Sequence, residues 1–226
     1  MADGAVMTLD EAIAGRRSVR AFLPREVPEE TIREVFELAQ RSPSNCNVQP
    51  WISHVVSGES LKALGRRMVE AASSGLAPDP DFTADRKFLG VYRERQIDAA
   101  VQLYGAMGIE RHDRPGRDWA YRRNLQFFDA PHAVFVFMFG EFEEREAVDL
   151  GIYAQTLMLA LTSRGISSCA QGALGLYPSI IRDHLGLDET HRILYGISFG
   201  YEDASAPANT TRVGRAPLGE AVVFHR

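Results

Sequence analysis

A chain of 226 residues, of which 45% are hydrophobic and 24% charged, can bury a core as one sizeable α/β domain without disulfides or structural metal. Its formal net charge of −5 argues against a protein that tracks nucleic-acid phosphates, so any anion site must be a local cluster of basic residues. Residues 1–10 lack a secretory signal, and no apolar stretch reaches the ~20 residues that cross a bilayer. Cys46 and Cys169 lack paired spacing and fit a reducing compartment. We therefore expect a cytoplasmic protein with no nucleic-acid or membrane partner.

The first third of the chain predicts two helices, a polar loop, a strand and a third helix. Thr8 and Glu11 have the spacing of a capping box, which predicts a short helix that Gly15 ends. A second helix is expected from Pro28 onward, because acidic residues follow at once and apolar residues recur with helical spacing. Residues 42–50 contain two prolines and short polar side chains, and they predict a loop without a regular element. A strand over residues 51–57, a helix over 59–72 and a break over 73–81 are expected next.

Residues 76–124 have the least regular pattern in the chain. Many arginines and scattered apolar residues predict helical structure there, with a polar loop over residues 111–118. We interpret residues 1–226 as a single domain in which residues 76–124 form a helical excursion that covers another part of the molecule.

The second half of the chain contains the most apolar segments. Residues 133–139 form an apolar run that predicts a strand buried on both faces. Residues 148–163 are apolar almost all round, so the helix they predict must be covered on every side, as a central helix or at a subunit interface. A short helix over residues 180–185, a central strand over 192–201 and a further strand over 221–224 are also expected. Helices and strands alternate irregularly, which favours an α+β fold with a mainly antiparallel sheet flanked by helices.

Several familiar catalytic patterns are absent from the sequence. There is no glycine-rich dinucleotide fingerprint after a strand, no phosphate-binding Gly/Lys/Ser run and no Gly-x-Ser-x-Gly turn. The six histidines show neither helical pairing nor a cysteine partner, so we expect no metal site.

Three polar segments are candidates for binding a ligand. Residues 16–20 (Arg-Arg-Ser-x-Arg) concentrate three guanidinium groups and a hydroxyl, which can hold a phosphate through charge-assisted hydrogen bonds. Residues 212–215 (Arg-x-x-Arg), with Asn209 nearby, repeat that chemistry in the tail. Residues 43–51 place amide side chains beside an indole and can hydrogen-bond the edge of a planar heterocycle. Taken alone, each segment is better explained as an ordinary helix end, solvated tail or capped turn.

Together and in this order, these segments resemble the nitroreductase family. The resemblance rests on Arg-Arg-Ser-x-Arg-x-Phe, on Ser-Pro-Ser-x-x-Asn-x-Gln-Pro-Trp about two dozen residues later, and on Gln171-Gly172 and Arg215-Ala-Pro. It covers nearly the whole chain, and residues 60–120 match least. It implies a nitroreductase-like α/β sandwich that works as a homodimer and binds FMN at the dimer interface, each site drawing on both chains.

The resemblance also implies individual roles. Arg16, Ser18 and Arg215 would hold the ribityl phosphate with help from Arg17 and Arg212, and Arg20 would lie near the N1 and C2 carbonyl edge of the flavin. The backbone at Gln171-Gly172 would donate to flavin N5, while Pro43, Ser44, Asn45 and Asn47 would approach from the partner subunit. The full cofactor-binding set is Arg16, Arg17, Ser18, Arg20, Pro43, Ser44, Asn45, Asn47, Gln49, Asn124, Gln171, Gly172, Arg212 and Arg215. No side chain is assigned as catalytic, because the chemistry is borne by the flavin.

The activity that the resemblance implies is electron transfer from NADPH or NADH to a nitroaromatic or quinone acceptor by a ping-pong mechanism. Other chemistry on the same fold stays open: an FMN-dependent reductive dehalogenase, an ene-reductase or a flavin-fragmenting enzyme. A non-catalytic reading, in which the protein sequesters or senses flavin, is also open. Many relatives carry glutamate where this chain has Gln171, which leaves substrate preference undecided.

Overall fold

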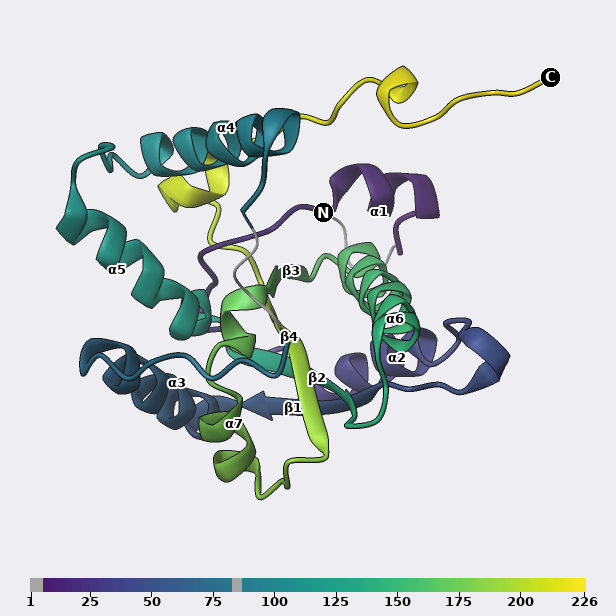
Figure 1. The fold of residues 1–226 in the computed structure, drawn as a ribbon, viewed down its shortest axis with the longest axis horizontal. Coiled ribbons are helices and arrows are strands. Elements are labelled where there is room, and N and C mark those ends of the chain that lie inside the picture. The colour runs from purple at the N-terminus through teal and green to yellow at the C-terminus, as the bar shows by residue number, and fades with distance from the viewer. Residues whose placement is uncertain (1–5, 83–86) are drawn as a thin grey trace.

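A four-stranded sheet forms the centre of the computed structural model, which describes residues 6–82 and 87–226 (Figure 1). The strands are β1 (Ile52–Ser57), β2 (His132–Phe139), β3 (Ser167–Gln171) and β4 (His191–Gly200). They lie in the order β1–β2–β4–β3, and all three neighbouring pairs are antiparallel. The predicted α+β fold with an antiparallel sheet is confirmed.

Helices cover both faces of this sheet (Figure 1). Within the described residues they are α1 (Leu9–Gly15), α2 (Glu29–Ala39), α3 (Gly58–Ser73), α4 (Gly90–Ala106), α5 (Arg114–Leu125), α6 (Glu144–Ser163) and α7 (Pro178–Leu185). Helices α2 and α6 pack in one hydrophobic cluster with the sheet, and α3 and α7 pack in another. No helix in this part of the chain is both long and apolar enough to span a lipid bilayer.

Strand β2 explains why the two clusters share one sheet. Its side chains alternate between them: Phe135 and Phe137 belong to the cluster of α3 and α7, while Val134, Val136 and Met138 belong to that of α2 and α6. A central strand covered by helices on both faces has no solvent side, so its sequence is continuously apolar. The strand predicted over residues 133–139 is therefore confirmed, and all of it except Phe139 is buried as predicted.

Capping sets the starts of the first and sixth helices. The predicted capping box is present in α1, where the Glu11 backbone N–H donates to Thr8 Oγ1 at 3.3 Å and the Thr8 N–H donates to Glu11 Oε2 at 2.8 Å. Helix α6 begins a turn before the predicted 148, because Glu143 and Glu146 form an equivalent box ahead of the apolar run. Gly165, with a φ of 71°, follows α6 in the left-handed conformation that ends a helix.

Three local predictions are wrong, and one strand was not predicted. The loop over 42–50 contains one 3-10 turn, Asn45–Asn47. Residues 111–118 are not all loop: Asp113 caps α5 by accepting from the Gly116 N–H, and a proline sits in the first turn. Strand β3 was not predicted, because five mixed residues show no clear period. Residues 221–224 form no strand.

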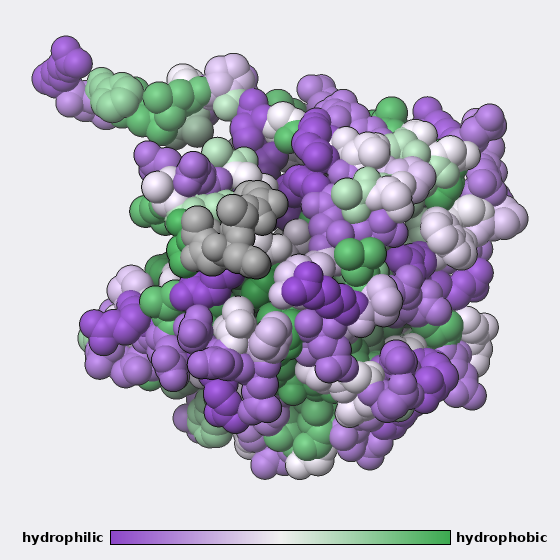
Figure 2. Space-filling model, turned by 180° about the vertical axis from the view of Figure 1, so that it is seen from behind, coloured by the Kyte–Doolittle hydropathy of each residue, from purple (hydrophilic) through white to green (hydrophobic). Residues whose placement is uncertain are grey.

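The C-terminal residues instead extend away from the body of the protein. Figure 2 shows this tail projecting from the molecule with hydrophobic residues along it. Val223 and Phe224 are 73% and 74% exposed. An extended apolar segment without cover in its own chain is a candidate for contact with a second chain.

Candidate functional site

The basic segment at residues 16–20 lies along the edge of the sheet. Ser18 forms a parallel bridge with Ser168 of β3, and the Val19 N–H donates to the Ser168 carbonyl at 3.1 Å. Val19 is buried in the core, so the side chains on either side of it point outward from the sheet edge. The segment is therefore fixed by backbone pairing.

Asn209 joins this segment to the C-terminal tail. Its side-chain amide donates to the carbonyls of Ala21 and Asp203 at 2.9 and 2.8 Å, and its Oδ1 accepts from the Arg20 N–H at 2.7 Å. Its own carbonyl accepts from Arg17 at 3.2 Å and from Arg212 at 2.7 Å. With 3% exposure and every polar atom of the amide used, Asn209 holds two basic segments that are about 190 residues apart in the chain.

These segments form a local positive patch on a chain of net negative charge. Arg17 is neutralised by an ion pair with Glu202. Within the described residues, Arg16, Arg20, Arg212 and Arg215 have no carboxylate within ion-pair distance. Burial raises the pKa of the Cys169 thiol, and the nearby guanidinium groups of Arg20 and Arg16 oppose that rise together with the Ser18 hydroxyl. The patch therefore favours a bound anion.

The end of β3 is tied to helix α5 through a buried side chain. The Gln171 amide donates to the carbonyl and to Oδ1 of Asn124, at 3.0 and 3.4 Å. Its Oε1 accepts from the Ser198 hydroxyl on β4. Gly172 follows directly and is exposed, and a Cβ at that position would meet open space. The side chain of Gln171 thus fixes three elements, while the next residue presents its backbone to solvent.

The loop at residues 43–49 is rigid but lies elsewhere. The Asn45 N–H donates to the buried Asp149 carboxylate on α6 at 3.1 Å, and the Gln49 N–H donates to Ser44 Oγ at 2.9 Å. Figure 1 shows the loop beyond the end of α2, well away from β3. Among the described residues no hydrogen bond joins it to the basic segments. Left-handed backbone occurs at Cys46, Asn47 and Gln49, with φ of 49°, 57° and 50°.

A cavity of about 370 Å³ opens beside Arg20 and Asn124. Helices α4 and α5 form its cover, and residues 206–208 of the tail close another side. Its remaining lining is largely aromatic and apolar, and includes Leu103, Tyr104, Met107, Trp119 and Phe128. A concave, mostly apolar space with a few fixed polar groups suits a small planar molecule.

Comparison with known proteins assigns the chain to a family. The model of the nitroreductase family matches residues 13–201. The chain belongs to the nitroreductase family. NfnB nitroreductase of Mycolicibacterium smegmatis is 45% identical to it over 218 residues, covering 96% of this chain and 92% of that protein. The 4-nitrobenzoate reductase of Pseudomonas putida is 37% identical, covering 91% and 90%.

A solved structure agrees with this assignment. The FMN-dependent nitroreductase NfnB from Mycobacterium smegmatis, crystallised with NADPH, superposes with a TM-score of 0.93 at 44% identity. The match covers 96% of this chain and 97% of that one. The nitroreductase resemblance drawn from the sequence motifs and the nitroreductase fold are both confirmed.

Within this nitroreductase chain, the predicted site residues fall into two groups. One protomer brings together the N-terminal basic segment, the start of the tail, Asn124, Gln171 and Gly172. The loop residues Pro43, Ser44, Asn45, Asn47 and Gln49 form a separate group on the other side of α6. Among the described residues, Arg215 donates only to the carbonyls of Val213 and Gly214 in its own exposed stretch of tail.

Three positioning residues of this nitroreductase were missed by sequence reasoning. The sequence pattern marks Asn209 only as a neighbour of Arg212, and it gives no site role to Asp149 or Ser198. Asp149 and Ser198 lie inside apolar runs, where a single polar residue is an available signal. A buried polar group needs a partner, and here each partner is a predicted site residue.

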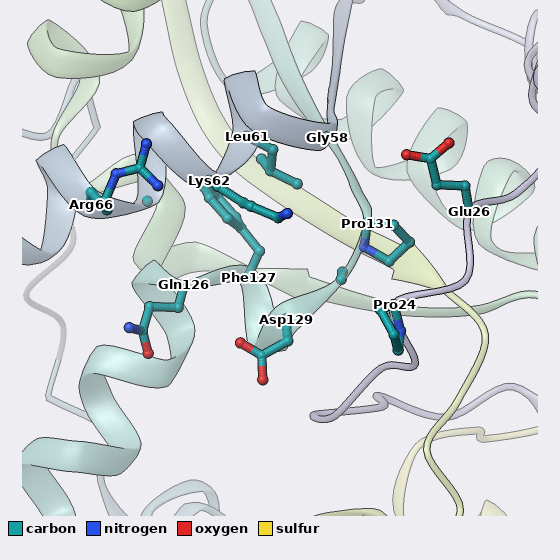
Figure 3. A pocket seen from close by; sticks show the side chains of 12 residues that line it. Pro24, Glu26, Gly58, Leu61, Lys62, Arg66, Gln126, Phe127, Asp129 and Pro131 are labelled. Carbon is teal, nitrogen blue, oxygen red and sulfur yellow. The ribbon is translucent and has the colours of Figure 1, made fainter.

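A second cavity, of about 390 Å³, lies on the other side of the turn at residues 127–129. Figure 3 shows Lys62 and Arg66 reaching over it from α3, with Phe127 below them and Glu26 across the opening. None of the predicted cofactor-binding residues lines it. This cavity is separate from the nitroreductase site.

Proposed function

We propose that this protein is an FMN-dependent oxidoreductase that transfers electrons from NADPH or NADH to nitroaromatic or quinone acceptors by a ping-pong mechanism. One observation supports this proposal most strongly: Asn209 joins residues 16–20 to the tail by hydrogen bonds, and residues 16–20 pair with β3. A phosphate and a planar ring system separated by a short chain need such a basic patch next to an aromatic cavity.

The residues present fit FMN. Arg16, Arg20 and Arg212 lie on the two segments that Asn209 joins, and within the described residues they have no carboxylate within ion-pair distance. In the same part of the chain, the buried Ser168 hydroxyl next to Ser18 has no hydrogen-bond partner. Arg16, Ser18 and Arg215 would hold the phosphate, with Arg212 and, more indirectly, Arg17, whose guanidinium already pairs with Glu202. Arg20 would stabilise negative charge at the N1 and C2 carbonyl edge of the ring.

FMN, when bound, supplies the two-electron redox chemistry between nicotinamide and acceptor. The chain contributes position and electrostatics. Hydrogen bonds to Asn124 and Ser198 fix the Gln171 side chain and so position the Gln171-Gly172 backbone at the end of β3. A backbone N–H at this point would donate to flavin N5. The cavity under α4 and α5 excludes water from one face of the ring and orients the acceptor. We interpret the excursion at residues 76–124 as this cover within a single domain.

We also propose that the protein is a cytoplasmic homodimer. The separation of the loop at 43–49 from the basic segments within one protomer supports sites that draw on two chains. Val148 and Ile152 on α6 are exposed in the single chain although both are apolar, and the tail extends away from the body. These surfaces predict a permanent interface above ~2,000 Å². Light scattering at micromolar concentration should give twice the 25.1 kDa chain mass, and a monomer would contradict the dimer.

Anaerobic reduction of the purified protein tests the activity. We expect flavin absorbance that bleaches with NADPH or NADH and returns when nitrobenzene or a benzoquinone is added. Arg20→Ala should lower both flavin retention and the reduction rate, whereas Arg67→Ala, on the outer face of α3, should change neither. Flavin that stays oxidised with either nicotinamide would favour sequestration, and a protein that takes up no FMN would contradict the proposal.

A further inference from the structure

The cavity beside Arg20 and Asn124 has a chemical bias of its own. Trp119 and Phe128 line it from α5 and from the turn after α5, and Tyr104 lines it from α4. Such walls suit one aromatic ring. Its lining also includes two guanidinium groups, those of Arg20 and Arg123. Because the proposed function assigns Arg20 to the flavin, Arg123 is the lining cation left to contact an acceptor.

Arg123 is a largely buried cation with unused donors. Its side chain is 17% exposed, and within the described residues its one hydrogen-bonded partner is the Asp129 carboxylate, whose side chain is 66% exposed. The guanidinium carbon lies 6.0 Å from the centre of the Trp119 ring. A guanidinium carries five N–H donors in a fixed fork, so one exposed carboxylate leaves most of its capacity unfilled.

The partner of the Arg123 guanidinium is a carboxylate, that of Asp129, and an unusual turn holds this carboxylate in place. Asp129 lies in a turn of three consecutive left-handed residues, Phe127, Phe128 and Asp129, with φ between 55° and 63°. Non-glycine residues in that region cost free energy, and they occur mainly where surrounding contacts enforce them. This turn separates the two cavities, because Phe128 lines one and Phe127 the other.

We propose that Arg123 is a specificity-determining residue that selects aromatic acceptors bearing a carboxylate or similar planar anion. The inference rests on the proposed function, since it names the acceptor class for the same site. An anionic substituent on the ring forms charge-assisted hydrogen bonds with the Arg123 fork while the ring lies against Trp119. The Asp129 carboxylate is the internal competitor for those donors.

The test compares two acceptors of the same shape, 4-nitrobenzoate and neutral 4-nitrobenzamide, with the FMN-loaded enzyme. Arg123→Gln should lower kcat/KM for 4-nitrobenzoate by about 10- to 100-fold, mainly through KM, and change that for 4-nitrobenzamide by less than about threefold. Calorimetric titration with benzoate, which cannot be reduced, should show the same loss of affinity. Asp129→Asn should strengthen benzoate binding, because it removes the internal competitor.

Two control variants test whether the preference for 4-nitrobenzoate depends on Arg123 itself. Arg122→Gln removes a neighbouring cation of α5 that does not line the cavity, and Arg66→Gln removes one over the cavity of Figure 3. Both should leave the preference for 4-nitrobenzoate unchanged. Equal losses on both acceptors in Arg123→Gln, or equal losses of preference in the matched variants, would overturn the inference. A wild-type enzyme whose flavin is not reduced by NADPH or NADH would overturn the proposed function and this inference with it. An enzyme that is reduced and passes electrons to a benzoquinone, but reduces both nitro acceptors without preference or reduces neither, would overturn the inference alone.

Discussion

The sheet core and the α4–α5 excursion use similar apolar residues with opposite results. Every residue of β2 except the last is buried, whereas α4 contains no buried residue among its seventeen. Val101 of α4 is 64% exposed although valine is a typical core residue, and Phe135 of β2 is fully buried. Burial is therefore decided by the layers around an element. The core supplies stability, while the excursion shapes a cavity and is anchored to the core at the end of α5, where Leu125 is fully buried.

The largest difference is expected from removing one side chain in each region. Phe135→Ala should lower the free energy of unfolding by about 3–5 kcal/mol, because it leaves a cavity next to Phe127 and α3. Val101→Ala should change it by less than about 0.5 kcal/mol, since its side chain is exposed. Urea titration of both variants checks this. A cost above about 1 kcal/mol for Val101→Ala would mean that α4 is covered in solution.

Breaking the hydrogen bond between Gln171 of β3 and Asn124 of α5, which joins the two regions, should have an intermediate effect on stability. In Gln171→Glu the carboxylate cannot donate to the Asn124 carbonyl, so a buried acceptor loses its partner, at a cost of about 1–3 kcal/mol. We also expect faster proteolysis in α4 and α5, because the end of α5 is no longer tied to β3. Gln126→Glu, at an exposed position, is the matched control. Unchanged proteolysis in Gln171→Glu would show that other contacts hold the excursion.

A smaller effect is expected at α1, on the periphery of the core. Thr8→Ala removes the hydroxyl that accepts from the Glu11 N–H and should cost about 1 kcal/mol. Thr8→Ser keeps that acceptor and should remain close to wild type. Equal losses in the two variants would attribute the effect to the methyl group and contradict the capping role.

The smallest effect is expected from pH, at the buried His132. Burial lowers the pKa of His132 below its ordinary 6.5, and the Val27 N–H donates to its Nε2 at 3.0 Å, which requires the neutral ring. Between the folded-state pKa and 6.5 the unfolded chain binds more protons. The contribution to stability is thus complete above pH 6.5 and is lost as the pH falls below it. His132→Asn should flatten this dependence between pH 7.5 and 5.5, and His112→Asn, on an exposed loop, should not.

The core was predictable because its signals are local and strong. The apolar run of β2, the capping box of α1 and the glycine after α6 each determine an element without reference to the rest of the chain. Strand β3 was missed, because its identity comes from pairing with β4 and with Ser18 and not from its own five residues. The apolar run at residues 221–224 predicts a strand wrongly, because a short apolar run does not reveal whether a neighbouring strand exists to pair with it.

The site was predictable only in its parts. Short motifs identified the arginines and the amide loop through resemblance to a family. They did not indicate that Asn209 joins the basic segments or that Asp149 holds the loop, because these contacts join positions more than a hundred residues apart. Which of these groups meet within one chain depends on its topology, which short motifs do not reveal.

A mixed dimer tests the central claim, that each flavin site draws on two copies of the chain, most directly. One chain carries Arg16→Ala and Arg20→Ala, and the other carries Asn45→Ala and Asn47→Ala. We expect both homodimers to lose flavin-dependent NADPH oxidation, and the purified heterodimer to regain about half of the wild-type activity, because one of its two sites receives intact residues from both chains. A heterodimer as inactive as its parents would place all of these residues in one protomer's site and contradict the account.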